Sequence, residues 1–387
     1  MTWRLGWLRA FVAGLVLLQA VQAARLATDS FLESYWIVNY EHGYVRRGLV
    51  GWILRLFGRP TEHRIVVAMW VVAASAFIAL LVVIFLLLRR ATPTSCALAV
   101  LMAASPFTLD YVVFQRRPDQ LAVPVLVALG VGLVRVERHV LAVCAVAGIA
   151  FGVLTFVHED IVLVVLPAAI VMVTLVLHGR APIIEPGRIA TSVLAVAAPA
   201  AIGAAVVTYL GPADQATLLA LRTDALNIPL GQLTVLNFLH DSLRTSIDRV
   251  VDFPRRILAA SLALGVALAA VQVWWVTRWA GAPIVRDVAR VPRRVRLVLS
   301  FIASAAAVVL FAIGLDWIRW CAALGCSALI VASFAVLSRR DGSAGPRADR
   351  LVLPRALPIL AIYLAVIAPL PPFALPGDAI RVLFLKQ

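Results

Sequence analysis

The sequence predicts an all-α integral membrane protein, a polytopic helix bundle with about eleven transmembrane helices and its N-terminus inside. Two observations, the composition and the spacing of apolar runs, predict this fold. Hydrophobic residues make up 63% of the 387 residues, charged residues only 14%, and the mean hydropathy is +0.97. Apolar runs close to the roughly 20 residues that a helix needs to cross a bilayer recur along the chain. We therefore expect residues 1–387 to form a single transmembrane domain embedded in the lipid bilayer.

Charged residues are shared unequally between alternate loops. If the N-terminus is cytoplasmic, the loops on that side hold 19 of the 35 basic residues but only 5 of the 20 carboxylates. Positive loops stay on the cytoplasmic side, so the asymmetry predicts the orientation and puts most carboxylates on the external face. The arginines are spread over short loops, which indicates contact with lipid head groups and no nucleic acid as partner. We expect a multi-pass protein of a bacterial-type plasma (inner) membrane.

The predicted spans follow one another with mostly short connections. They cover residues 6–26, 65–88, 94–113, 121–136, 140–157, 161–178, 189–211, 257–277, 297–315, 320–338 and 355–373. The first resembles a signal peptide, but it is long enough to cross the bilayer and we expect it to be retained. The runs at 121–136 and 320–338 are the least regular, and tilted, broken or re-entrant helices are alternatives there.

Two external stretches are long enough to carry structure of their own. The first external loop covers residues 27–63 and ends in an amphipathic segment, and a long external loop covers residues 212–255. Both mix apolar and charged residues, which is typical of short amphipathic helices lying on a membrane surface. We find no internal repeat, which weighs against a transporter built from inverted halves.

The first external loop is the richest in ionisable residues. Asp29 and Glu33 lie one helical turn apart just beyond the first span, and Glu41, Arg46 and Arg47 follow. A carboxylate can act as a general base, and neighbouring guanidinium groups can bind a phosphate bidentately. We predict that the three acidic residues are catalytic and that the two arginines bind phosphate. The alternative is an interfacial helix with arginines that extend toward the head groups.

Three further external loops place charged residues at the ends of spans, where an unpaired charge is costly. For Arg116, Arg117 and Asp119 the alternatives are phosphate or sugar contacts and an ordinary surface ion pair. For the hairpin His158-Glu159-Asp160 they are a hydrogen-bonding or proton-handling role and a simple polar cap. Asp316 and Arg319 would pair on a helix. The candidate substrate-binding residues are Arg116, Arg117, Asp119, His158, Glu159, Asp316 and Arg319. No zinc-type spacing of His and Cys occurs, so no metal ligand is assigned. A divalent metal stays an open alternative, and no other cofactor is expected.

Together these motifs describe the floor of an external cavity at the mouth of a helix bundle. In this layout, and in the position of Asp29, the chain resembles the GT-C class of membrane glycosyltransferases. The resemblance implies a polyprenyl-phosphate-linked sugar as donor, a cell-envelope glycan or lipid as acceptor, and Asp29 as general base. The spacing Asp29-x-x-x-Glu33 departs from the Asp-Glu or Asp-x-Asp pairs of many members of the class.

A second resemblance is to Wzy/EpsG-like polysaccharide polymerases. It is carried by residues 40–44, followed by Arg46 and Arg47, and by the late external loop 212–255. The leading hypothesis is a glycosyltransferase acting on the external face, and a polymerase is the alternative enzyme. A transporter or an envelope scaffold is the non-enzymatic alternative. Most charges lie at span ends and few near the mid-plane, which counts against a transporter.

Overall fold

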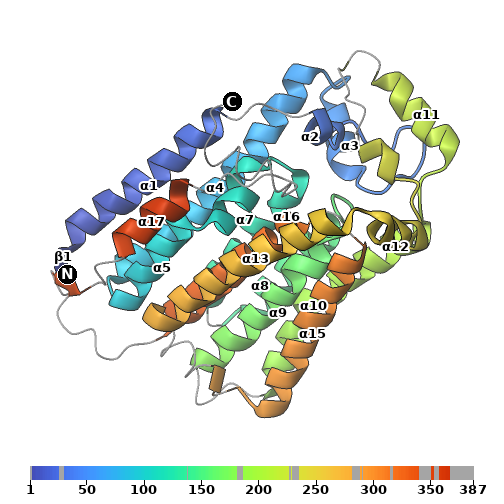
Figure 1. Ribbon diagram of the computed structural model, residues 1–387. Helices are drawn as coiled ribbons and strands as arrows, with labels where there is room; N and C mark the ends of the chain where they lie inside the picture. Colours follow the sequence, from blue (N-terminus) through green and yellow to red (C-terminus); the bar gives the residue numbers. More distant parts are fainter. Residues whose placement is uncertain are drawn as a thin grey trace.

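The computed structural model of the protein describes residues 2–25, 30–136, 138–180, 186–225, 228, 235–280, 288–289, 291–313, 317–339, 350–352 and 357–366. Helices account for almost all of this structure (Figure 1). Within the described residues, eight helices are long and apolar enough to cross a membrane, or up to nine if a bent pair counts as one span. The predicted all-α multi-pass bundle is therefore confirmed.

Every predicted span overlaps a helix of the described residues. The helices long enough to cross a membrane are α1 (Leu5–Arg25), α4 (Glu62–Arg90), α7 (Ala122–Arg135) together with the preceding turn η2 (Pro118–Leu121), α9 (Ile161–Arg180), α10 (Pro186–Leu210), α13 (Arg255–Trp275), α15 (Arg293–Ile313) and α16 (Trp317–Leu337). The shorter ones are α8 (Val140–Leu154) and α17 (Leu357–Val366). Segment η4 (Val276–Ala280) extends α13, and the strands β1 (Thr2–Arg4) and β2 (Arg350–Val352) form one antiparallel pair.

The span that breaks is the one at 94–113. It consists of α5 (Pro93–Ala104), α6 (Pro106–Leu109) and η1 (Asp110–Phe114), and the chain bends by 54° between the first two. Pro106 lacks the N–H that would continue the first helix, so the rod breaks at this residue. The runs at 121–136 and 320–338, for which a broken helix was an alternative, form the continuous helices α7 and α16.

Short helices gather at one end of the bundle, at the upper right in Figure 1, away from β1 at the left. They are α2 (Ser30–Ser34), α3 (Leu49–Leu56), η2 (Pro118–Leu121), α11 (Gln215–Asp224), η3 (Val235–Phe238) and α12 (Leu243–Asp252). Exposed apolar side chains of α3, such as Trp52 and Leu56, are typical of a helix lying on the bilayer surface. The helices expected in the two long external loops are thus present. We call this end of the protein the polar rim.

The centre of the bundle is formed by α9 and α16. In their apolar windows 72% and 67% of the residues are buried inside the protein, against 6% in α15, which lies at the edge. Helices α8 and α10 pack closely through small residues. A Cβ atom at Gly148 would lie 2.2 Å from the Ala195 carbonyl oxygen, and one at Gly152 2.7 Å from that of Pro199. Such small-residue contacts are a common way to join helices in a membrane.

Where two loops are joined by polar contacts, the charge pattern had assigned both loops to the same side of the membrane. At the predicted internal end, Arg90 donates to the carbonyls of Leu337 and Arg339, and Arg188 donates to that of Arg138. At the polar rim, the corresponding contacts join the loops predicted to be external. The alternation of sides read from the sequence is therefore consistent with the folded bundle.

Candidate functional site

The loop after α2 turns into the protein and is buried. Residues Tyr35 to Asn39 are each no more than 3% exposed. Asn39 holds the turn that follows, since its side chain donates to the Ile37 carbonyl at 2.9 Å and accepts from the Glu41 N–H at 2.9 Å. Gly51 allows α3 to lie against this loop, because a Cβ atom there would lie 2.0 Å from the Val38 carbonyl oxygen. The sequence of small and polar residues thus fixes the loop below the surface of the rim.

Tyr35 stands among side chains from three other segments, two of which contribute an arginine and one a histidine. The guanidinium carbon of Arg117 lies 5.4 Å from the centroid of its ring and that of Arg47 lies 5.8 Å from it. Arg117 also donates to the Tyr35 hydroxyl at 3.4 Å. The ring of His158 stacks on the tyrosine with a centroid distance of 5.9 Å and an angle of 26°. We call these four residues the Tyr35 cluster, in which an aromatic face favours cations.

A buried ion-pair network continues from His158. Its Nδ1 lies 2.6 Å from Asp160 Oδ1, and Arg319 Nη1 donates to Asp160 Oδ2 at 3.4 Å. The same nitrogen donates to Asp119 Oδ2 at 3.0 Å. All four side chains are at most 5% exposed. Ionised groups buried to this extent are costly unless they are paired, and here each carboxylate has a cationic neighbour.

Two polar atoms of this network lack a hydrogen-bond partner among the described residues, His158 Nε2 and Asp119 Oδ1. Most buried polar atoms in proteins are paired, so an exception indicates a water, an ion or a ligand atom as the absent partner. The carboxylate of Asp160 carries a pKa below its ordinary value. Burial raises that pKa, but the neighbouring His158 and Arg319 outweigh the effect.

Arg47 and Glu159 form a bidentate pair beside the Tyr35 cluster. Arg47 Nη2 donates to Glu159 Oε1 at 2.6 Å, and its Nε donates to Oε2 at 3.0 Å. Burial raises the pKa of Glu159, but the charge and hydrogen bonds of Arg47, with the charge of Arg46, outweigh it and hold the pKa well below its ordinary value. Burial likewise lowers the pKa of Arg47, but the pairing with Glu159 raises it by more. The pKa of Arg47 therefore lies above its ordinary value. Both side chains are therefore ionised at neutral pH.

Arg46 connects the two long external loops. Its Nη2 donates to the carbonyl oxygens of Asp241 at 2.8 Å and of Phe238 at 3.3 Å. The carboxylate of Asp241 in turn pairs with Arg249 at 2.8 Å and 3.0 Å. The predicted phosphate ligand thus already has backbone acceptors in the folded protein, and it fixes the loop that contains η3.

Arg116 follows the third span, and its side chain lies against the C-terminal end of α1. Its Nη2 donates to the carbonyl oxygen of Ala23 in α1, and its guanidinium carbon lies 3.9 Å from the Trp70 ring centroid. Burial lowers its pKa from the ordinary value. Glu33 is buried in α2 at 4% exposure. Two other predicted site residues, Asp29 and Asp316, lie outside the described residues.

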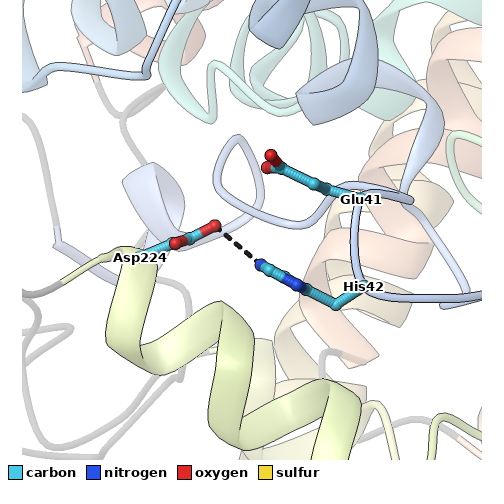
Figure 2. A group of neighbouring side chains, drawn as sticks. All are labelled: Glu41, His42 and Asp224. Atoms are coloured by element: carbon cyan, nitrogen blue, oxygen red, sulfur yellow. Dashed lines mark hydrogen bonds and ion pairs between the residues drawn. The ribbon is translucent and has the colours of Figure 1, made fainter.

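Glu41 belongs to a different, exposed group that Figure 2 shows. Glu41, His42 and Asp224 each offer one ligand atom, and these atoms lie within 4.8 Å of one another. His42 Nε2 contacts Asp224 Oδ2 at 2.9 Å. Arg55 is paired with Glu41 and lies 3.8 Å from Asp224, so a cation already serves these carboxylates. The group joins α3 to α11 through ion pairs at the surface.

An open hollow of about 420 Å³ lies in the same segments of the polar rim. It is lined by Tyr40, Gly43, Tyr44, Phe156 and Leu210. The rings of the two tyrosines stack with centroids 6.1 Å apart and an angle of 10°. Burial, followed by the charge of Glu159, raises the pKa of Tyr44 to about 12, so its phenol is neutral at ordinary pH.

Sequence reasoning missed two residues of this region. Tyr35 lies in an aromatic-rich stretch that is also typical of a membrane interface, and nothing in its spacing separates it from neighbouring aromatic residues. Asp160 directly follows two residues that were predicted, and the tight hairpin of three ionisable residues was the available signal. The structure shows that it is Asp160, and not Glu159, that contacts both His158 and Arg319.

The family model described as "Uncharacterised membrane protein Rv1490" matches residues 6–253. The chain belongs to this family. The match includes every member of the Tyr35 cluster and both carboxylates of the buried network, and it ends before Arg319. The family description names a membrane protein, in agreement with the multi-pass bundle.

Relatives of the chain include "Uncharacterized protein Rv1490" and "Uncharacterized protein MT1536" of Mycobacterium tuberculosis and "Uncharacterized protein Mb1527" of Mycobacterium bovis. Each is 30% identical over 132 residues, which is 33% of this chain and 30% of the relative. The match thus spans less than a third of the length of these curated relatives. No solved structure matches the chain significantly.

Proposed function

We propose that the protein is a membrane glycosyltransferase that moves a sugar from a polyprenyl-phosphate carrier to a cell-envelope glycan or lipid. The reaction would take place at the polar rim, on the external face of a bacterial plasma membrane. The observation that carries the proposal is the Tyr35 cluster, in which arginines from two loops and a histidine from a third meet at a single buried ring.

Cations at this position suit the leaving group of such a reaction. A lipid phosphate stays at the membrane surface, and negative charge develops on it as the bond to the sugar breaks. Each charge-assisted hydrogen bond contributes roughly 1.5–3 kcal/mol, so two well-placed arginines would accelerate the reaction by several hundred-fold or more. Arg117 and Arg47 are the proposed phosphate ligands, with Arg116, Asp119 and Arg319 as their supports.

The hollow in the polar rim supports a sugar in the same region. The stacked rings of Tyr40 and Tyr44 offer flat apolar surface. Their hydroxyls are buried without a hydrogen-bond partner among the described residues, and a sugar hydroxyl would supply one. Asp29 is the general base that the GT-C resemblance implies, and Glu33 and Glu41 are further proposed carboxylates. Arg46 and Glu159 would hold the loops that surround the donor.

A polysaccharide polymerase is the second candidate, because the loop 212–255 packs on the first external loop. Ser34 Oγ accepts from the Val235 N–H at 2.8 Å, and Arg46 binds the carbonyls that follow. A long ordered segment over the site could retain a growing chain. The two enzymes differ in product, since a transferase adds one unit and a polymerase makes a ladder of lengths.

The test is a transfer assay on the protein in nanodiscs with a panel of polyprenyl-phosphate-linked sugars. We expect wild type to release the lipid phosphate and Arg117→Gln to lose at least a hundred-fold in rate, with Arg117→Lys intermediate because it keeps charge without the bidentate fork. The control is Arg59→Gln, an exposed arginine of the first external loop, which should keep wild-type activity. No transfer from any donor by folded wild type would leave a transporter or a scaffold.

A further inference from the structure

We propose that His158 is the group that takes the proton from the acceptor hydroxyl, and that Asp160 positions it. The inference rests on the proposed transfer reaction and names a further catalytic residue for it. It comes from the described residues alone, independently of the base that the family resemblance implies.

The contact with Asp160 decides which imidazole nitrogen carries the proton. A distance of 2.6 Å between Nδ1 and a carboxylate oxygen requires a proton between them. Asp160 is ionised, since its pKa lies below the ordinary value and its other oxygen accepts from Arg319. The backbone N–H of Asp160 also points to Nδ1, but at 3.4 Å it is the weaker contact. The proton therefore belongs to Nδ1, and in the neutral ring the lone pair lies on Nε2.

Nε2 is the atom that lacks a partner among the described residues, in a side chain that is 1% exposed. A buried acceptor without a donor is destabilising, whereas a substrate hydroxyl at this atom would satisfy it. Stacking on Tyr35 fixes the plane of the ring, so the direction of the lone pair is fixed as well. The same tyrosine contacts Arg117 and Arg47, which places the proposed proton acceptor next to the proposed phosphate ligands.

The step balances as follows. The acceptor oxygen attacks the anomeric carbon and forms the new glycosidic bond, while the bond from that carbon to the phosphate oxygen breaks and its electron pair stays on the lipid phosphate. The hydroxyl proton moves to Nε2, and the imidazolium is stabilised by the carboxylate of Asp160. Release of that proton to water or to the departing phosphate restores the neutral ring.

The matched control lies on the same face of the protein. His42 and Asp224 also form a histidine–aspartate pair, with 2.9 Å between Nε2 and Oδ2, but both are exposed. With the lipid-linked donor that wild type uses, we expect His158→Gln to lower kcat by 10²–10⁴-fold with little change in the KM for donor, the range that general bases contribute. His42→Gln should stay within twofold of wild type.

Two further measurements separate a base from a packing residue. Imidazole added to His158→Gly should restore part of the lost rate, while it should not affect Arg117→Gln. In protein labelled with ¹⁵N-histidine, the His158 signal, assigned as the one absent from His158→Gln, should report Nδ1–H and an unprotonated Nε2. Asp160→Asn should change that tautomer and lower kcat, whereas Asp224→Asn should do neither.

The outcomes are distinguishable. An inactive wild type would overturn the proposed function and the proton transfer with it. An active wild type whose folded His158→Gln variant keeps at least half of the rate would overturn the role of His158 alone, and loss of activity in Asp29→Asn under that condition would assign the base to Asp29. A ¹⁵N spectrum with the proton on Nε2 would also overturn it, even if the Asp160→Asn variant failed to fold.

Discussion

Arg46 and Arg47 are adjacent in sequence, yet their closest partners differ. Arg47 pairs with Glu159 at 2.6 Å, whereas Arg46 lies 3.9 Å from that carboxylate and binds backbone carbonyls more closely. Arg47 has a φ of +66°, in the left-handed region, which turns its side chain away from that of its neighbour. It reaches Glu159 and the Tyr35 ring, while Arg46 reaches backbone carbonyls of residues 238–241. At the residue scale, the local backbone conformation therefore separates a proposed phosphate ligand from a residue that fixes a loop.

The pair of Arg47 with Glu159 predicts a pH dependence of stability. The pKa of Glu159 is lower in the folded protein than its ordinary value of 4.5, so the pair stabilises the fold fully above that pH. The stabilisation is lost as the pH falls through the lower, folded-state pKa. We expect the thermal midpoint of wild type to decrease below about pH 4.5, and that of Glu159→Gln to start lower and decrease less.

The measurement is thermal unfolding in detergent from pH 7 to pH 3. Glu62→Gln is the control, because this exposed residue in the first turn of α4 has no ion pair among those found in the described residues. A decrease of the same size in wild type and in Glu159→Gln would show that other carboxylates cause the acid sensitivity.

At the element scale, the bundle depends on where helices approach closely and where they break. Pro106 bends the third span, which brings η1 and η2 together at the polar rim. Gln120 of η2 then donates to the Tyr111 carbonyl at 2.7 Å. The bend therefore helps to bury Asp119 in the network with Arg319. Small residues in α8 and α10 allow those helices to approach closely next to the hairpin that carries His158.

The contact of α8 with α10 predicts the effect of a larger side chain. Gly152→Leu would force its side chain against the Pro199 carbonyl, and we expect a loss of about 1–3 kcal/mol, the usual range for overpacking. The check is unfolding of the purified protein in detergent. Gly14→Leu in α1 is the control, because nothing lies within 4 Å of a Cβ atom there. Equal stability of the two variants would contradict close packing at Gly152.

At the scale of the whole molecule, the two ends of the bundle differ in what their loops contain. The polar rim holds the buried network, the Tyr35 cluster and the group around Arg55, while the opposite end holds arginines that donate to backbone carbonyls. An enzyme that uses a lipid-linked substrate needs this asymmetry, since its charged groups must be concentrated at one surface of the bilayer.

The charge pattern predicts that the polar rim is external. In whole cells, a maleimide that does not cross membranes should label Arg244→Cys directly and Arg188→Cys only after permeabilisation. Both positions are exposed, and they lie in loops on opposite sides. The four native cysteines are mostly buried, and unmodified protein provides the background. The reverse labelling pattern would show that the N-terminus is outside.

The sequence by itself determined the helices and the alternation of their ends. Whether a segment prefers lipid is a property of its own side chains, and whether a loop stays inside depends on its own arginines. For this reason each of the eleven predicted spans overlaps a helix of the described residues, of which eight or nine are long and apolar enough to cross a membrane. The amphipathic helices of the two long loops are present as well.

Only the tertiary structure decided which charges meet. Arg319 finds Asp119 and Asp160 across 200 and 159 residues of sequence, and Arg47 finds Glu159 across 112. These pairings depend on how the helix ends are brought together and on single backbone angles, neither of which leaves a periodic pattern in the sequence. Tyr35 and Asp160 therefore emerged as candidate site residues from the packing of loops, because a charge that is buried must take its partner from whichever loop lies next to it.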